Sequence, residues 1–332
     1  MIIGILRIIS ELNKLFLNYD CLKTIAHFLR LVRWPNLVFI LLAEILFHFC
    51  IYKPLYPQAG SDVDAHFYLI ALTYLFIAAA GFIINDYFDI NIDQVNKPTK
   101  VVVGAFISRR WVIFWHLLFS VLGIYISTIA FPFQSYWHIH LSNLLTILLL
   151  WFYSTNFKKD FLIGNVVISI LTAWSIAVVY FSKYTIQEIM HPNIHDAANF
   201  RFAKIMVLYS VFAFILTLVR EALKDMEDME GDQKFGCKTL PIIWGLQPTK
   251  VYISVWLVVV IGCLAFIQLY VIPFGWWYCI AYCLFCIITP LVIVLVKLKS
   301  AYLSQDFKQL SKYVKIAMFT GILSMAFFYF LL

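Results

Sequence analysis

Residues 67–90 read FYLIALTYLFIAAAGFIINDYFDI and combine an uninterrupted apolar run with an acidic end. The first 18 residues of this stretch contain no charged side chain, and about 20 mostly apolar residues in a helix are enough to cross a bilayer. A strand in lipid would need a closed barrel and alternating polarity, which this run lacks. The stretch therefore predicts a membrane-spanning helix that ends in carboxylates.

The remainder of the chain repeats this apolar pattern. Of its 332 residues, 63% are hydrophobic and 13% are charged, against roughly 25% charged in an ordinary soluble domain. We expect an all-α polytopic membrane protein in which residues 1–33 form a cytoplasmic amphipathic segment and residues 34–332 form the transmembrane domain. This domain would be a bundle of about nine helices, at 36–52, 67–92, 111–131, 138–156, 161–182, 205–226, 250–271, 275–296 and 314–332.

The lysines and arginines predict the orientation of this bundle. If the N-terminus is cytoplasmic, 21 of the 25 basic residues fall in inner segments and four in outer ones, as the positive-inside rule requires. This distribution accounts for the net charge of +7 without nucleic acid as a partner. It also places the acidic end of the first stretch on the cytoplasmic side.

Two segments carry carboxylates on one helical face. Because a helix turns about 100° per residue, one face of about 100° holds Asn85, Asp86, Asp89 and Asp93. The segment REALKDMEDMEGDQKFGCKTLPI, residues 220–242, repeats the arrangement within about 60° if its helix continues, with Glu221, Asp225, Asp228 and Asp232. Its two glycines, Gly231 and Gly236, predict that the helix frays into a loop there.

Crowded carboxylates near lipid repel each other and are costly to ionise. A solvated acidic helix end paired with lysines would explain one such cluster, but two on the same side favour a compensating cation. Mg²⁺ prefers oxygen ligands and often binds through one or two carboxylates together with substrate phosphates. We therefore expect two facing clusters that hold Mg²⁺ and a diphosphate, with the ligands Asn85, Asp86, Asp89, Asp93, Asp225, Asp228 and Asp232.

The motifs in this order resemble those of the UbiA-type membrane prenyltransferases. NDYFDINID at 85–93 is similar to the family's first motif, N-D-x-x-D-x-x-x-D, and Asp228 and Asp232 match its second, D-x-x-x-D. The crowded acids of the second segment look most like the digeranylgeranylglyceryl phosphate synthase branch. The sequence departs from the family pattern at Ile90 and at Lys100, which leaves diphosphate contacts and acceptor choice open. Three further matches are VRWPNL at 32–37, YSTNFKKDFLIGN at 153–165 and NKP at 96–98.

The resemblance implies an enzyme: a Mg²⁺-dependent prenyltransferase that moves a prenyl group from an allylic diphosphate to an acceptor. It implies a geranylgeranyl donor, an acceptor such as geranylgeranylglyceryl phosphate, and a role in lipid biosynthesis, with membrane lipids around the protein and no protein partner. The residues expected to act in catalysis are Asp86, Asp89, Asp93, Asp228 and Asp232. Those expected to bind substrate are Arg33, Asn36, Lys97, Tyr153, Lys158 and Glu221.

Two other functions are open at this point. An aromatic acceptor, as in quinone biosynthesis, would require a smaller site and an arginine that binds its carboxylate. Arg33 could bind either this carboxylate or the phosphate of a prenylglyceryl phosphate. A cation transporter without enzymatic activity would place its acids near the bilayer midplane, often within inverted repeats. Here both acidic segments lie at helix ends and no repeat is visible.

Overall fold

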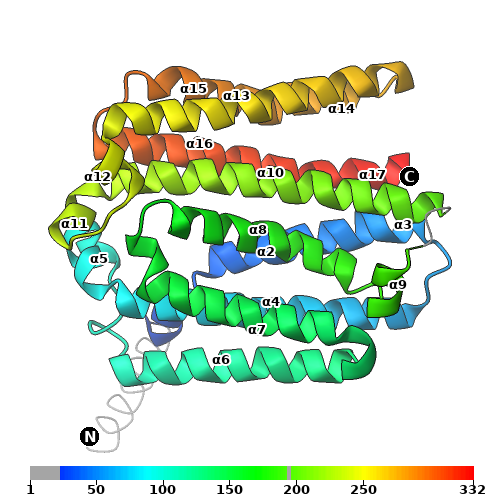
Figure 1. Cartoon of the computed structure of the whole chain (residues 1–332), viewed down its shortest axis with the longest axis horizontal. Coiled ribbons are helices and arrows are strands. Elements are labelled where there is room, and N and C mark those ends of the chain that lie inside the picture. Colours follow the sequence, from blue (N-terminus) through cyan, green and yellow to red (C-terminus); the bar gives the residue numbers. More distant parts are fainter. Residues whose placement is uncertain (1–22, 193–195) are drawn as a thin grey trace, which may run out of the picture.

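The computed structural model of the chain describes residues 23–192 and 196–332. Its described residues form helices and no strand, which confirms the predicted all-α class (Figure 1). The N-terminal helices and turns are α2 (Trp34–Leu46), η1 (Phe47–Tyr52), α3 (Lys53–Leu55), α4 (Ser61–Phe88), α5 (Ile90–Asn96), α6 (Arg109–Ala130), α7 (Phe133–Thr155), α8 (Ile163–Phe181) and α9 (Ile186–Met190). The C-terminal ones are α10 (Ala197–Glu227), α11 (Met229–Lys234), α12 (Leu240–Trp244), α13 (Leu246–Val271), α14 (Trp277–Tyr282), η5 (Cys283–Ile288), α15 (Thr289–Leu298), α16 (Ser304–Leu323), η6 (Ser324–Phe327) and α17 (Phe328–Leu331).

Eight of the described helical segments are long and apolar enough to cross a membrane, judged by length and composition. The long helix outside this set is α7, whose first half carries polar side chains such as His138, His140 and Asn143. The predicted count of nine spans is therefore not confirmed. Most of the expected segment 1–33 lies outside the described residues, although 23–31 are helical.

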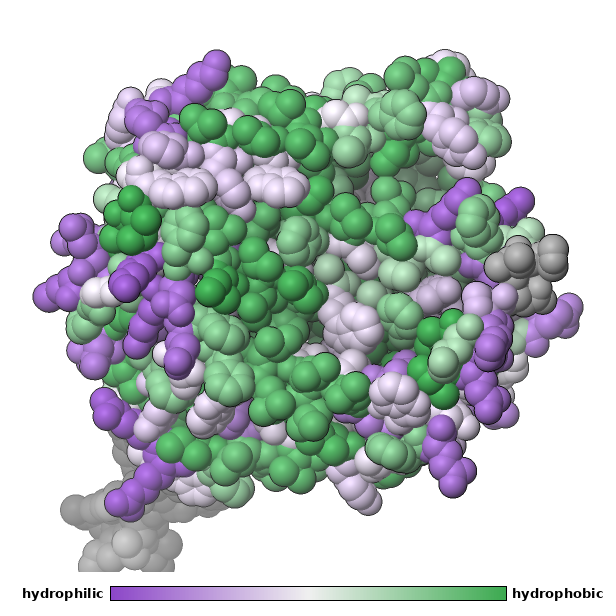
Figure 2. All heavy atoms as spheres, in the orientation of Figure 1, coloured by the Kyte–Doolittle hydropathy of each residue, from purple (hydrophilic) through white to green (hydrophobic). Residues whose placement is uncertain are grey.

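The long helices run side by side, and their polar side chains gather at the two ends of the bundle, with apolar ones between (Figures 1 and 2). In the middle, α10 packs against α8 on one side and α16 on the other. Its buried Leu216, Val219 and Leu223 join α13, α15 and α16 in one apolar core. Because α10 is the central element, its acidic end is held at a fixed place in the bundle.

Each acidic helix is broken at an aspartate. Asp89 separates α4 from α5, and Asp228 separates α10 from α11. The expectation that the second helix frays at Gly231 is wrong, because helix α11 continues through this residue, and it is Gly236, with φ of 71°, that follows its end. The breaks allow α5 and α11 to turn toward each other, and the two short helices are in contact.

Lys183 lies near Asp64 and Tyr52, at the end of the bundle opposite to the acidic segments. Its position predicts that the stability of the fold depends on pH. Burial lowers the pKa of Lys183 to about 7 despite the charge of Asp64, and its Nζ lies 4.6 Å from the ring centre of Tyr52. An unfolded chain keeps this proton up to the ordinary lysine pKa of 10.5. Burying the charged lysine therefore lowers the free energy of unfolding by its full amount below about pH 7, and by less and less as the pH rises toward about 10.5. We expect Lys183→Met to raise the melting temperature at pH 6 but not at pH 10, and the exposed Lys204→Met to change neither. An equal shift of Lys183→Met at both pH values would contradict this reading.

Candidate active site

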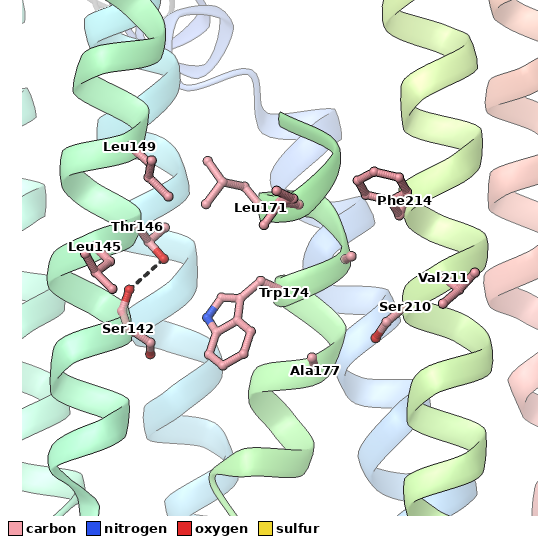
Figure 3. A pocket seen from close by; sticks show the side chains of 12 residues that line it. Ser142, Leu145, Thr146, Leu149, Leu171, Trp174, Ala177, Ser210, Val211 and Phe214 are labelled. Carbon is pink, nitrogen blue, oxygen red and sulfur yellow. Dashed lines mark hydrogen bonds between the residues drawn. The ribbon is translucent and has the colours of Figure 1, made fainter. Parts of the chain in front are cut away.

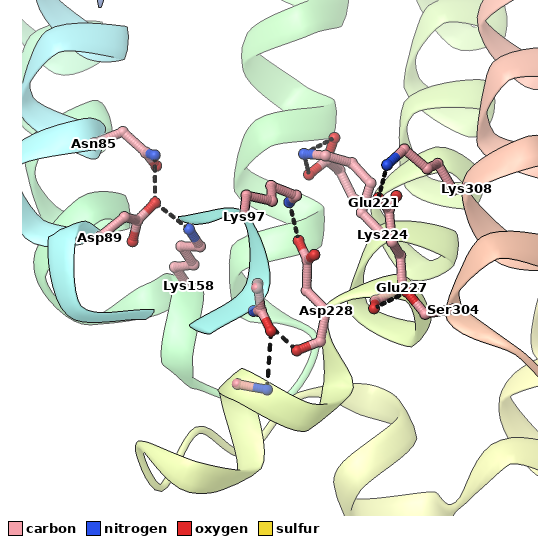
Figure 4. A network of polar contacts seen from close by, with 12 residues as sticks. Asn85, Asp89, Lys97, Lys158, Glu221, Lys224, Glu227, Asp228, Ser304 and Lys308 are labelled. Carbon is pink, nitrogen blue, oxygen red and sulfur yellow. Dashed lines mark hydrogen bonds and ion pairs between the residues drawn. The ribbon is translucent and has the colours of Figure 1, made fainter. Parts of the chain in front are cut away.

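The two acidic helix ends lie against each other (Figure 4). Asn96, at the end of α5, donates from Nδ2 to the backbone oxygen of Asp228 at 3.1 Å. The backbone N–H of Gly231 in turn donates to Asn96 Oδ1 at 2.9 Å. A Cβ at position 231 would lie 2.3 Å from this oxygen, so the contact requires glycine. The structure thus brings together the two segments that the sequence predicts to face each other, through a contact that the sequence did not reveal.

Gly231→Ala tests this contact. Alanine favours a helix more than glycine does, so a loss of activity would come from displacing the Asn96 side chain and breaking its contact with α11. A displacement of about 1 Å can cost about 100-fold in rate, and we expect a decrease of about 10- to 100-fold in turnover with the protein still folded. Gly262→Ala is the control, since nothing lies within 4 Å of a Cβ there. Wild-type turnover in Gly231→Ala would show that the spacing of the two ends is unimportant.

Two lysines join carboxylates of the acidic segments to their surroundings. Lys97 Nζ donates to Asp228 Oδ2 at 2.5 Å and so links the first segment to the second. Lys158 donates to Asp89, which also accepts from Asn85 Nδ2 at 2.5 Å (Figure 4). Burial alone would lower the pKa of Lys158, but the charge and hydrogen bond of Asp89, together with Tyr153 and Asp93, outweigh burial and raise this pKa. These lysines are the cationic partners of Asp228 and Asp89 in this structure.

The other predicted ligands divide between paired and unpaired carboxylates. Arg33 Nη2 donates to Asp86 Oδ1 at 2.5 Å, and Asn165 Nδ2, which the sequence analysis did not single out, donates to Asp225 Oδ2 at 2.8 Å. Asp93 and the buried Asp232 have no hydrogen bond or ion pair from their side chains to another described residue. Burial raises the pKa of both, that of Asp232 to about 6, and neighbouring carboxylates add to the effect.

The donor set fits Mg²⁺ that is shared with a substrate. Within the described ranges, no three His, Cys, Asp or Glu side chains converge closely enough to hold a metal ion by themselves. Mg²⁺ commonly takes only one or two carboxylates and completes its shell with water and phosphate oxygens. Asp232 is buried, and its carboxylate, which has no partner among the described residues, is the kind of donor that a cation would satisfy.

An inner cavity of about 220 Å³ adjoins the first acidic segment, and four of the predicted substrate residues line it: Arg33, Asn36, Tyr153 and Glu221. Lys97 and Lys158 do not line this cavity; both contact the acids instead. The structure adds Arg220, Lys224 and Lys315 to the lining. The sequence analysis missed these three, although Arg220 and Lys224 lie one helical turn apart and flank Glu221.

A larger groove of about 480 Å³ lies between α7, α8 and α10 (Figure 3). Its lining is almost entirely apolar, with Leu145, Leu149, Leu171 and Phe214 among its residues. Trp174 lies on its wall and donates from Nε1 to the hydroxyl of Tyr74 at 2.6 Å. This groove is therefore suited to a hydrocarbon chain, while the charged side chains lie at the end of the bundle.

Comparison with protein families and with curated relatives supports the family resemblance of the sequence motifs. The sequence model of the UbiA prenyltransferase family matches residues 38–330. The digeranylgeranylglyceryl phosphate synthase of Methanothermobacter thermautotrophicus is 34% identical over 186 residues, which are 54% of this chain and 56% of that protein. The synthase of Methanosphaera stadtmanae is 28% identical over 263 residues, 76% of this chain and 84% of that protein. The chain spans only about 56% to 61% of the length of the first relatives that it matches.

Solved structures share the fold. A structure of digeranylgeranylglyceryl phosphate synthase superposes with a TM-score of 0.60 at 21% identity, over 93% of this chain and 100% of the other. A UbiA homologue from Archaeoglobus fulgidus, bound to DMAPP and Mg²⁺, gives 0.54 at 19% identity, over 90% of this chain and 99% of the other. At these identities the comparison establishes the fold, that of an integral, multi-pass membrane protein.

Proposed function

Because the chain belongs to the UbiA prenyltransferase family, we propose that it transfers a prenyl group from an allylic diphosphate to a lipid-pathway acceptor. The donor is geranylgeranyl diphosphate and the acceptor is a molecule such as geranylgeranylglyceryl phosphate, the branch to which the matched relatives belong by name. The single observation that supports this most is the pairing of the two acidic helix ends through Lys97, Asn96 and Gly231.

The proposed roles follow from the position of each group. Two groups of side chains would hold Mg²⁺. The first acidic segment supplies Asn85, Asp86, Asp89 and Asp93, and the second supplies Asp225, Asp228 and Asp232. When bound, Mg²⁺ stabilises the negative charge that grows on the departing diphosphate. Lys97, Lys158 and Arg33, which contact carboxylates in this structure, donate to phosphate oxygens when the diphosphate arrives. Tyr153, Asn36 and Glu221 border the reacting carbon from the inner cavity.

The apolar groove between α7, α8 and α10 suits the donor's prenyl tail. Leu149 lines this groove and the next residue, Leu150, lines the inner cavity, so the two spaces lie on either side of one turn of α7. A chain of isoprene units laid along the groove would cover its apolar lining. We further propose that the acidic ends and the N-terminus face the cytoplasm, as the distribution of basic residues favours.

The test is product analysis with purified protein in proteoliposomes. Labelled geranylgeranyl diphosphate is supplied with a panel of acceptors: geranylgeranylglyceryl phosphate, an aromatic acid and no acceptor. We expect mass spectrometry to find one prenyl ether per diphosphate released, and only with the phosphate acceptor. Prenylation of the aromatic acid would favour the quinone-type alternative, and cation flux without any prenyl product would favour the transporter.

A further inference from the structure

The inner cavity carries more positive charge than its carboxylates balance. It lies between α2, α4, α7, α8, α10 and α16, and the basic side chains in its lining are Arg33, Arg220, Lys224 and Lys315. Arg33 is already paired with Asp86. The other three basic groups come from the two neighbouring helices α10 and α16.

Glu221 is the carboxylate that contacts these cations, and it contacts two of the three. Glu221 accepts from Arg220 Nη1 at 2.9 Å and from Lys224 Nζ at 2.9 Å. Among the residues that the structure describes, Lys315 donates only to the neutral amide oxygen of Asn36, at 3.2 Å. Three cations against one carboxylate leave an excess of two positive charges in a bundle where unpaired charge is costly. A bound anion with about two negative charges would therefore neutralise the cavity.

Two apolar cavities adjoin this one in turn. A smaller cavity of about 50 Å³ shares Phe39, Ile40 and Met318 with its lining. That cavity in turn shares Phe212 and Gly321 with a third, of about 140 Å³, between α10, α13, α14 and α16. This path is separate from the groove between α7, α8 and α10, with which the inner cavity shares no lining residue. The anion that the cations select would therefore carry a hydrocarbon chain.

We propose that Arg220, Lys224 and Lys315 bind the phosphate monoester of an acceptor lipid whose chain lies along these adjoining apolar cavities; the assignment of this ligand as the acceptor rests on the proposed function. A phosphate monoester carries about −1.5 to −2 charges near pH 7, which matches the excess. The arginine fork suits phosphate oxygens. A small aromatic acid, with one negative charge and no chain, would leave one cation unmatched and the apolar path empty.

A direct binding measurement tests this phosphate site without requiring turnover. Protein in nanodiscs with EDTA is titrated with dodecyl phosphate, dodecanol, inorganic phosphate and inorganic diphosphate, and binding is followed by thermal stabilisation. We expect dodecyl phosphate to bind at least about 10-fold more tightly than the other three, because only it combines charge and chain. Tighter binding of inorganic diphosphate than of dodecyl phosphate would overturn the proposal. Equal binding of inorganic phosphate and dodecyl phosphate would overturn the role of the apolar path.

Variants then locate the ligand. Lys315→Met and Arg220→Gln should each weaken dodecyl phosphate binding at least about 10-fold, whereas Lys312→Met, an exposed position on α16, should not. Mg²⁺-dependent binding of a non-hydrolysable geranylgeranyl diphosphate analogue should change less than about 2-fold in all three. Unchanged dodecyl phosphate affinity in both variants, or an equal loss of the diphosphate analogue, would overturn the assignment. If the wild type forms no prenyl product, the proposed function fails while the binding result still decides this site.

Discussion

Replacing Asp232 with asparagine should lower the rate of prenyl transfer by at least about 100-fold while the protein stays folded. Asp232 is 6% exposed and its carboxylate has no partner among the described residues. The charges that act on it come from Lys158, Asp228, Asp89 and Lys97, so it faces both acidic segments. Because asparagine has the same shape and no charge to desolvate, folded stability should not fall. The measurement is turnover with geranylgeranyl diphosphate beside the melting temperature.

Two other variants show whether the effect of Asp232→Asn is specific to this carboxylate. Glu230→Gln changes an exposed acid on the same short helix and should leave turnover unchanged. Asp89→Asn should also abolish turnover, but it removes the partner of Lys158 and leaves a half-buried cation, so some stability would be lost with it. Asp232→Asn at wild-type rate, or with a melting temperature that falls as far as its rate, would remove Asp232 from the proposed site.

The sequence predicts the fold well because membrane helices depend on a local property. A run such as 67–84 has no charge, and hydropathy alone identifies it as a helix. The sharing of a face by carboxylates is equally local, since it follows from helical geometry. The family resemblance of the motifs is confirmed by the match over residues 38–330.

The features that the sequence could not provide depend on contacts between distant segments. The contact between Asn96 and Gly231 joins residues 135 positions apart, and the periodicity of either helix says nothing about it. The helix breaks at Asp89 and Asp228 are likewise not marked by proline or glycine. The cations of the inner cavity come from helices far apart in sequence, so no spacing rule joins Arg220 to Lys315.

Removing divalent metal should abolish turnover without unfolding the protein. Loss of the several kcal/mol that a metal ion contributes at a developing charge corresponds to a decrease of at least about 1000-fold, reversed by added Mg²⁺. The fold should survive because Lys158 and Lys97 keep Asp89 and Asp228 paired. Turnover measured before and after EDTA, and again with excess Mg²⁺, tests this; undiminished turnover in EDTA would contradict the metal assignment.

The same titration has a readout that does not depend on turnover. Ligand that binds only the folded state raises the melting temperature with its concentration, so Mg²⁺ with a non-hydrolysable diphosphate should stabilise the wild type. Asp232→Asn should lose most of this shift, whereas Glu230→Gln should keep it, because Asp232 is buried and its carboxylate has no partner among the described residues, whereas Glu230 is exposed. An equal shift in both variants would mean that Mg²⁺ binds elsewhere. Retention of the shift in Asp232→Asn together with loss of turnover would instead place this carboxylate at a later step than metal binding.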